Sequence, residues 1–193
     1  VVLAVILSLI VLAPVRTESA SLPGANGKIA FESYRDGDNE IYAIKADGTA
    51  TTQLTDNPAD DVQPAWSPSG DRIAFASDRD GGIYQVFVMD AGGTNVQALT
   101  NDPLAAWSPT WSPDGKSIAY NGMAEGNWDI YVISVSTQIS HRVTTDPANE
   151  TQPRWSPDGT SIAFVSDRDG NLELYVMGAS GMNETRLTNT PAE

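Results

Sequence analysis

Catalytic chemistry has few candidate residues in this sequence. The chain contains one histidine, His141, in the stretch SHRVTT, and it contains no cysteine. A nucleophilic serine needs a base beside it and an acid that orients the base, and no acid lies at a useful fixed spacing from His141. The stretch GASGM at 178–182 lacks the second glycine of a G-x-S-x-G turn. We therefore expect no enzymatic activity, and we predict that His141 is an exposed surface residue.

Aspartates recur in a motif that could hold a metal ion. The motif SDRDG, or its variant SYRDG, occurs at 33–37, 77–81 and 166–170. Asp167, Asp169 and Asn171 alternate like the oxygen ligands of calcium, but the glycine of the motif arrives two places too early for the D-x-D-x-D-G loop. We therefore predict a turn in which Arg168 pairs with a carboxylate of a neighbouring repeat, and we expect no metal ion and no cofactor.

Net charge limits the partners that this chain can bind. It carries 11 Lys and Arg residues against 25 Asp and Glu residues, for a formal net charge of −14. Such a chain repels nucleic-acid phosphates and anionic membrane surfaces alike. We expect no nucleic-acid partner, and the 40% of hydrophobic residues is sufficient for a folded domain with a buried core.

The elements that must position these residues are repeats. Three stretches of ten residues are nearly identical, WSPSGDRIAF, WSPDGKSIAY and WSPDGTSIAF, at 66–75, 111–120 and 155–164. A fourth copy is marked by Ile29-Ala30-Phe31, which occupies the same column as the apolar triplets that end these stretches. A period of about 44 residues with four strand-like segments is typical of a β-propeller blade.

Each repeat predicts four strands, and their polarity predicts their place in the blade. The first strand ends at Trp-Ser-Pro, and Asp-Gly then makes a tight turn into the second. The second and third strands, such as IAF at 73–75, are continuously apolar, which suits burial between neighbouring blades. The fourth, such as TTQLT at 51–55, alternates and fits the wet outer edge. We predict that Trp66, Trp111 and Trp155 pack between blades.

The combined pattern xPxWSPDGxxIAFxSDRDGNxxIYVM resembles the WD40-like repeat of TolB-type propellers over residues 27–193. This resemblance implies an all-β fold, in a family that usually has six blades. We expect about four four-stranded antiparallel blades, as an open arc or as part of a six-bladed ring; a closed four-bladed ring is the alternative. The predicted blades are 27–61, 62–105, 106–149 and 150–193, and no Trp-Ser-Pro strand precedes the first.

The N-terminal residues predict export. Residues 1–13, VVLAVILSLIVLA, form an apolar run of the length of a signal-peptide core, and small residues near 17–21 offer a cleavage point. We predict a partial signal peptide at 1–20, a linker at 21–26, and a periplasmic or secreted protein. The alternative is the end of a transmembrane anchor, since a bilayer span needs about 20 apolar residues. Contact with a membrane is expected only through this segment, if it is uncleaved.

Alternating strand directions bring two sets of loops to one face of the propeller: those between the second and third strands, and those that lead into the next blade. We call this surface the acidic loop face. Three arginines lie in its loops, Arg35, Arg79 and Arg168. Its acidic residues are Asp36, Asp38, Asp56, Asp60, Asp61, Asp78, Asp80, Asp102, Glu125, Asp146, Glu150, Asp167 and Asp169. The excess of acids predicts a cationic partner whose binding weakens as salt rises; alternatively, these carboxylates only solvate the loops.

Three aromatic residues depart from the repeat. Trp107 lies in the doublet WSPTWSP, and Tyr84 and Trp128 lie at the ends of loops in the second and third blades. Because the other blades have different residues in these columns, we predict that the three cluster at the junction of these blades and stack on a sugar or grip a basic peptide. The alternative is local packing. The candidate ligand-binding residues are Tyr84, Trp107, Trp128, Asp60, Asp61 and Glu150.

Two classes of function remain open at this point. The first is a non-enzymatic, exported propeller that binds a protein, a peptide or a glycan on the acidic loop face. The second is the N-terminal propeller of a larger enzyme, such as a prolyl-oligopeptidase-type peptidase, whose catalytic domain lies outside this sequence. A fold hosts many functions, so the fold alone does not separate them.

Overall fold

The structure, a computed structural model, describes residues 27–35, 37–101 and 104–191. The predicted signal peptide and linker at 1–26 lie outside the described residues, as do Asp36 and Asp102 of the acidic loop face. The described part of the chain forms fifteen strands and has no helix that is long and apolar enough to cross a membrane.

The strands form four antiparallel sheets, and each sheet is one blade in which consecutive strands pair. Blade 1 contains β1 (Lys28–Ser33), β2 (Glu40–Lys45) and β3 (Thr52–Gln53). Blade 2 contains β4 (Asp61–Trp66), β5 (Arg72–Ser77), β6 (Gln85–Asp90) and β7 (Gln97–Ala98). Blade 3 contains β8 (Ala106–Trp111), β9 (Ser117–Ala124), β10 (Asn127–Ser134) and β11 (Ser140–Arg142). Blade 4 contains β12 (Glu150–Trp155), β13 (Ser161–Ser166), β14 (Glu173–Gly178) and β15 (Thr185–Arg186).

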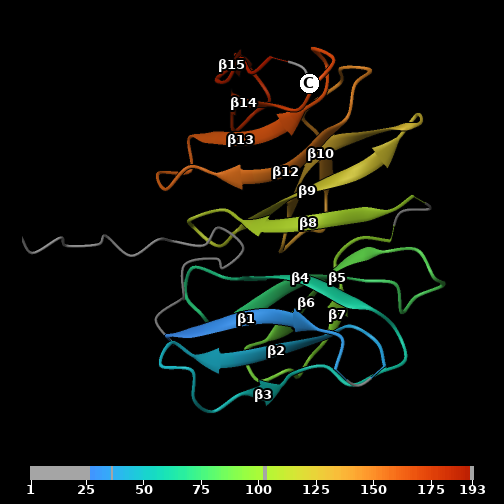
Figure 1. Cartoon of the computed structure of the whole chain (residues 1–193), viewed down its shortest axis with the longest axis vertical. Helices are drawn as coiled ribbons and strands as arrows, with labels where there is room; N and C mark the ends of the chain where they lie inside the picture. The colour runs from blue at the N-terminus through green and yellow to red at the C-terminus, as the bar shows by residue number, and fades with distance from the viewer. Residues whose placement is uncertain (1–26, 36, 102–103, 192–193) are drawn as a thin grey trace, which may run out of the picture.

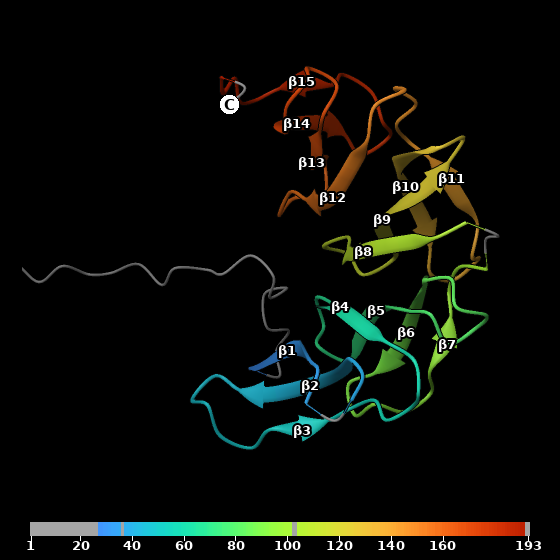
Figure 2. The same cartoon turned by 45° about the vertical axis from the view of Figure 1, so that its right-hand side comes forward.

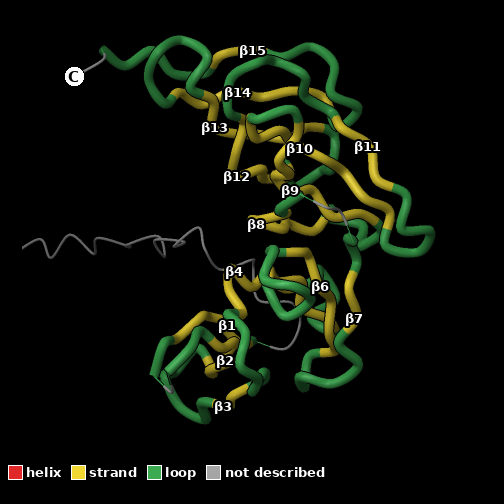
Figure 3. The backbone as a smooth tube through the Cα atoms, turned by 90° about the vertical axis from the view of Figure 1, so that its right-hand side faces the viewer, coloured by secondary structure: helices red, strands yellow, loops and turns green. Residues whose placement is uncertain are grey.

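The blades follow one another around an open arc (Figures 1 and 2). The first strands β4, β8 and β12 lie on the inner side of the arc, and the short last strands lie on the outer side (Figure 3). The predicted all-β propeller with an open arrangement of blades is thus confirmed. Blade 1 departs from the expected four strands: among the described residues its sheet has three, and the sequence has no Trp-Ser-Pro stretch before β1.

Burial decreases from the middle strands to the outer edge of each blade, as the sequence pattern predicts. In β5, Ile73, Ala74, Phe75 and Ala76 are fully buried. Both residues of the last strand of blade 1, Thr52–Gln53, are exposed. A strand covered on both faces by neighbouring blades must be apolar on both faces, whereas an edge strand in water need not be.

The recurring tryptophans pack between blades. Trp66 is 2% exposed and joins a core cluster with residues of blade 1, and Trp111 is 6% exposed and packs against blade 2. The indole N–H of Trp111 donates to the backbone carbonyl of Ala65 at 3.1 Å. Trp155 is partly buried against the cluster between blades 3 and 4. These contacts confirm the predicted inter-blade position of the three side chains.

Each first strand carries a bulge that links it to the preceding blade. Gln63, Ser108 and Gln152 occupy the same column and have positive φ angles of 55°, 54° and 54°. The strand register shifts at each of these places. The bulged backbone N–H of Gln63 donates to Glu32, and that of Ser108 donates to the side-chain oxygen of Gln63, at 2.7 and 2.8 Å. The bulges thus turn backbone donors toward the neighbouring blade.

The turn between the third and fourth strands docks on the preceding blade through a glycine. At Gly93, with φ +84°, a Cβ atom would lie 2.2 Å from the carbonyl oxygen of Leu54 in blade 1. At Gly181, with φ +82°, it would lie 2.4 Å from the carbonyl oxygen of Val143 in blade 3. Only glycine permits such a close approach of two backbones, so these turns fix the spacing of the blades.

Blade 4 has one covered face and one exposed face. On its outer face, Leu174 is 44% exposed and Leu187 is 58% exposed. Their counterparts in blade 2, Val86 and Leu99, are 0% and 8% exposed because blade 3 covers them. This face of blade 4 therefore has the composition of a blade interface, and among the described residues no blade covers it.

Candidate binding site on the acidic loop face

Two of the unusual aromatic residues form a pair where blades 2 and 3 meet. Tyr84 immediately precedes β6, and Trp107 is the second residue of β8. Their ring centroids are 4.0 Å apart with the planes tilted by 37°. The backbone N–H of Ala106 donates to the carbonyl of Tyr84 at 2.8 Å, which holds the two segments together. Both side chains are partly exposed, so the pair presents an aromatic surface to solvent.

Carboxylates surround the phenol end of this pair. The Tyr84 hydroxyl donates to Asp60 Oδ2 at 3.4 Å. Asp60 Oδ1 accepts from the backbone N–H of Asn39 at 2.8 Å and from its side-chain amide at 3.0 Å. The backbone N–H of Asp60 donates to Asp78 at 3.0 Å. A chain of bonds from blade 1 to the loop of blade 2 thus positions Asp60 beside the aromatic pair.

The electrostatics of Tyr84 reflect these neighbours. Burial, as the largest cause, and the negative charges of Asp60, Asp78 and Glu32 together raise the pKa of Tyr84 to about 12. An anionic phenolate is disfavoured by desolvation and by nearby carboxylates. Tyr84 therefore remains a neutral hydrogen-bond donor at physiological pH, beside several carboxylates.

Asp61 and Glu150 lie beneath the loop face rather than on it. Both are fully buried at the start of the first strand of their blades. Asp61 accepts two bonds from the Arg79 guanidinium, at 2.6 and 2.8 Å. Glu150 accepts from Arg168 at 3.1 Å and from the Ser166 hydroxyl at 3.0 Å. Their carboxylates fix the arginines of the SDRDG loops, so they support the loop face without direct access to a ligand.

The arginines of these loops pair mainly within their own blade. The Arg168 guanidinium contacts Glu184 at 2.6 Å and Glu150 at 3.1 Å, both in blade 4. Its approach to Asp146, in the loop that leads out of blade 3, is 3.9 Å. The expected pairing across blades is therefore the weakest of the three contacts, because the first strand of the same blade supplies a buried carboxylate closer by.

Glu150 supplies a prediction for the pH dependence of stability. Burial raises its pKa from 4.5 to about 7, against the opposing effect of Ser166 and Arg168. The folded chain then keeps a proton that the unfolded chain loses at lower pH. This contribution to stability is fully present below the unfolded pKa and is lost as pH rises through the folded pKa.

We expect the free energy of unfolding of the unaltered chain to fall, relative to that of a Glu150→Gln variant, between about pH 5 and about pH 8. Glutamine keeps the shape and a hydrogen-bonding group but does not titrate in this range. Urea unfolding of both chains at several pH values measures the difference. A difference that is constant with pH, or that changes in the opposite sense, would show that Arg168 keeps Glu150 ionised throughout.

Trp128 belongs to the next junction. It lies on β10 two residues before Ile130, so the two side chains share a face of the sheet. Ile130 belongs to the cluster that packs against blade 4. The backbone N–H of Trp128 donates to Asn149, which in turn bonds to Asp167 of blade 4. The structure thus brings Tyr84 and Trp107 together, whereas Trp128 lies beside the junction of blades 3 and 4.

Two arginines of this face were missed in the sequence. Arg142 ends β11 and pairs with the buried Asp129 at 2.7 Å and with Glu125 at 3.3 Å. Arg186 ends β15 and pairs with Glu173 at 2.9 Å and with Asp169 at 3.1 Å. Both occupy the same position of the repeat, and this recurrence is the sequence feature that could have identified them. They pair with carboxylates of blades 3 and 4, whereas Asp60 and Asp78, which act on Tyr84, have no ion pair among the described residues.

Buried carboxylates elsewhere in the blades have structural partners. Three of them share one column of the repeat and are almost completely buried: Glu40 and Glu173 are the first residues of β2 and β14, and Asp129 is the third residue of β10. A threonine of the following segment bonds to the side chain in this column, as Thr188 does to Glu173 and Thr100 does to Gln85. The recurrence shows that these groups attach the outer strand to the blade. In the described part of the chain, no three acidic or histidine side chains could hold a metal ion, and His141 is exposed on β11.

Fold and site together define an open β-propeller arc with an aromatic and acidic patch on its loop face. Comparison with known proteins makes the assignment specific. Residues 17–106 and 100–192 match the family described as TolB beta propeller domain. The chain belongs to this family.

The similar proteins include TolB itself. A Tol-Pal system protein TolB of Desulfosudis oleivorans is 40% identical over 71 residues, which are 36% of this chain and 16% of that protein. The structure of TolB from Acinetobacter baumannii superposes with a TM-score of 0.75 at 27% identity, over 84% of this chain and 42% of that one. A puromycin-hydrolyzing peptidase of Mycobacterium tuberculosis shares the fold with a TM-score of 0.67 at 16% identity, over 85% of this chain and 27% of that one. The chain thus spans about a sixth of the curated TolB relative.

Proposed function

We propose that this chain is an exported, non-enzymatic binding module whose acidic loop face takes a cationic segment of a protein or peptide. The observation that carries the proposal is the partly exposed pair of Tyr84 and Trp107, held beside Asp60 and Asp78. Aromatic faces attract lysine and arginine, and nearby carboxylates strengthen that attraction. The pair occurs at one junction and breaks the repeat, so the common architecture of the blades does not require it.

The family supports the export and the binding role. The apolar run at 1–13 and the membership in the TolB beta propeller family agree with a periplasmic or secreted protein. One relative is named as a component of the Tol-Pal system, and a protein partner for this chain is inferred by analogy with that name. The likeness to a peptidase is at 16% identity and concerns the fold alone, so it adds no catalytic role to this chain.

We expect a Trp107→Ala variant to bind a lysine-rich peptide at least about tenfold more weakly than the unaltered chain, because it loses the larger ring of the pair. Trp128→Ala is the matched control, since it removes the same side chain from the neighbouring junction, and its effect should be smaller. Calorimetric titration with pentalysine at low and at high salt measures the affinity of each variant. Binding should weaken as the salt concentration rises.

The melting temperature separates a binding role from packing. Trp107→Ala should leave it nearly unchanged, because the ring is partly exposed. A loss of stability of about 3–5 kcal/mol, as for a core tryptophan, would show that Trp107 packs the junction. Salt-independent binding of pentalysine, or equal binding by both tryptophan variants, would contradict the proposed site.

A further inference from the structure

The turn between the third and fourth strands differs in blade 3. In blades 1, 2 and 4 this turn is tight, because the N–H of a glycine donates to the backbone carbonyl three residues before it. The glycines are Gly48, Gly93 and Gly181. Blade 3 has Thr137 in this column and no glycine in the turn. There Gln138 donates to the carbonyl of Ser134, four residues back, so the turn is wider. The change occurs at the junction of blades 2 and 3.

A side chain at this position cannot fit where the glycine docks. A Cβ at Gly93 or Gly181 would overlap a carbonyl oxygen of the preceding blade, at 2.2 or 2.4 Å. These carbonyl oxygens belong to Leu54 in blade 1 and Val143 in blade 3. In blade 2 the residue at the same position of the repeat is Leu99, which follows β7. Because the turn of blade 3 carries Thr137, it must stand away from Leu99, and space opens between the blades.

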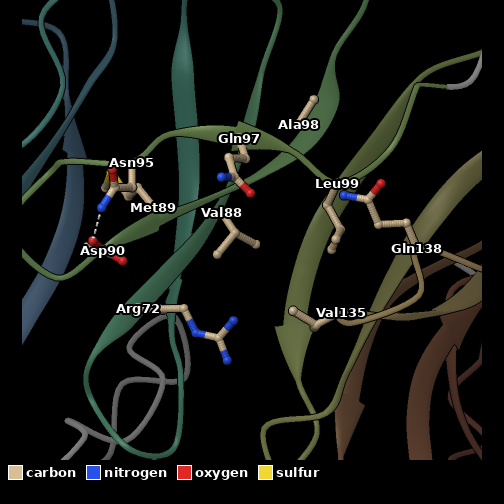
Figure 4. Close-up of a pocket in the computed structure, with 10 residues that line it drawn as sticks. All are labelled: Arg72, Val88, Met89, Asp90, Asn95, Gln97, Ala98, Leu99, Val135 and Gln138. Carbon is tan, nitrogen blue, oxygen red and sulfur yellow. Dashed lines mark hydrogen bonds between the residues drawn. The ribbon is translucent and has the colours of Figure 1, made fainter.

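The structure has a pocket at this place, with a volume of about 340 Å³ (Figure 4). Val135 and Gln138 of the blade 3 turn form one wall, and blade 2 supplies the rest, including Val88 and Leu99. The pocket lies on the side of the arc opposite the acidic loop face, because its turns are those at the other ends of the strands. Its volume suits a small molecule, at the lower end of the range for ligand sites.

The pocket is lined by one positive and one negative side chain, Arg72 and Asp90, that form no ion pair with each other. Arg72 and Asp90 are directly opposite on β5 and β6. The Arg72 guanidinium is instead stacked over the Trp111 ring, 4.9 Å from its centroid, with only the exposed Asp71 at 4.0 Å. The Asp90 carboxylate accepts from the Asn95 amide at 2.6 Å through Oδ2. Among the described residues, no ion pair joins Arg72 to Asp90, so each charge is held in place by another group.

We propose that this pocket binds a free α-amino acid with an apolar side chain. Its carboxylate would receive the paired N–H groups of Arg72, for which a guanidinium is well shaped. Its ammonium would donate to Asp90 Oδ1, and its side chain would contact Val88, Leu99 and Val135. A zwitterion has no net charge, so the overall charge of −14 does not repel it, as it would repel a simple anion.

The test is a titration of the chain with L-leucine, followed by the NMR signals of valine and leucine methyl groups. Saturable shifts are expected for Val88, Leu99 and Val135. N-acetyl-leucine lacks the ammonium and leucine amide lacks the carboxylate, so each should bind at least about tenfold more weakly, the loss expected for one charge-assisted hydrogen bond. Equal affinity for all three compounds, or no shift at these methyl groups, would overturn the proposal.

Variants separate the two charges. Asp90→Asn should weaken the binding of leucine but leave the binding of N-acetyl-leucine, which has no ammonium, unaffected. Arg72→Gln should weaken the binding of leucine but leave the binding of leucine amide, which has no carboxylate, unaffected. Replacement of residues 135–139 by the sequence of 91–95 restores the glycine turn at equal length and should abolish binding by filling the pocket. Undiminished leucine binding in this graft, or in both point variants, would also overturn the proposal.

Discussion

Replacement of Arg79 by alanine is expected to lower the free energy of unfolding by about 3–5 kcal/mol, because it leaves the buried carboxylate of Asp61 without its positively charged partner. Asp61 is fully buried, and Arg79 gives it two hydrogen bonds of 2.6 and 2.8 Å. The guanidinium also covers the rings of Phe75 and Phe87, at 5.3 and 4.9 Å from their centroids. The loss of the ion pair with Asp61 and the loss of the ring contacts both lower the stability of the fold.

Arg35 provides the matched control for Arg79. It occupies the same column in blade 1, where it bonds to Ser33 and lies 4.1 Å from the centroid of the Tyr42 ring. The described part of blade 1 contains no strand before β1, and so no residue corresponding to Asp61. Arg35→Ala should therefore cost much less in urea unfolding experiments. Similar losses for the two variants would show that the ring contact, and not the buried ion pair, carries the stability.

Gly93→Ala is expected to destabilise the chain by about 2–5 kcal/mol through the contact between blades 1 and 2. The new methyl group would lie 2.2 Å from the carbonyl oxygen of Leu54, and backbone rather than a flexible side chain would have to move. The residue also has a φ of +84°, which alanine adopts at a cost of about 1–2 kcal/mol.

Gly48 isolates the docking contribution because it differs only in its surroundings. Its φ is +80°, and nothing lies within 4 Å of the position of a Cβ. Gly48→Ala therefore loses stability only through the unfavourable backbone conformation. The additional loss in free energy of unfolding for Gly93→Ala, about 1–3 kcal/mol for overpacking, measures the contact between the blades. Equal losses in thermal or urea unfolding would mean that the turn of blade 2 can shift away from Leu54 at no cost.

Much of the fold follows from local pattern. The column of Ile73 and Ile118 predicts inner strands, and both residues are fully buried. The recurrence of Trp66 and Trp111 predicts packing between blades, because every junction needs the same surface. These features are predictable because each depends on residues of one repeat and on the repeat next to it.

The candidate site depends on side-chain direction, which a repeat alignment does not determine. Asp60 and Asp61 are adjacent in sequence, yet Asp60 reaches Tyr84 whereas Asp61 points into the blade and meets Arg79. Trp128 falls on the opposite face of its sheet from the one that packs on blade 2, because strand residues alternate. The pocket at Leu99 likewise required the turn geometry, since the absence of one glycine does not by itself show where the turn moves.

The uncovered outer face of blade 4 has a consequence for how the arc loses its structure. Blades 2 and 3 are each held by two neighbours, whereas in the described chain blade 4 has only blade 3 against it. In a stack whose stability is a sum of units and nearest-neighbour couplings, the units at the ends open first and the opening moves inward. The four described blades, taken by themselves, should therefore open from blades 1 and 4 inward, with Leu187 released before its counterpart Leu99, and the junction of blades 2 and 3 should be the last to separate.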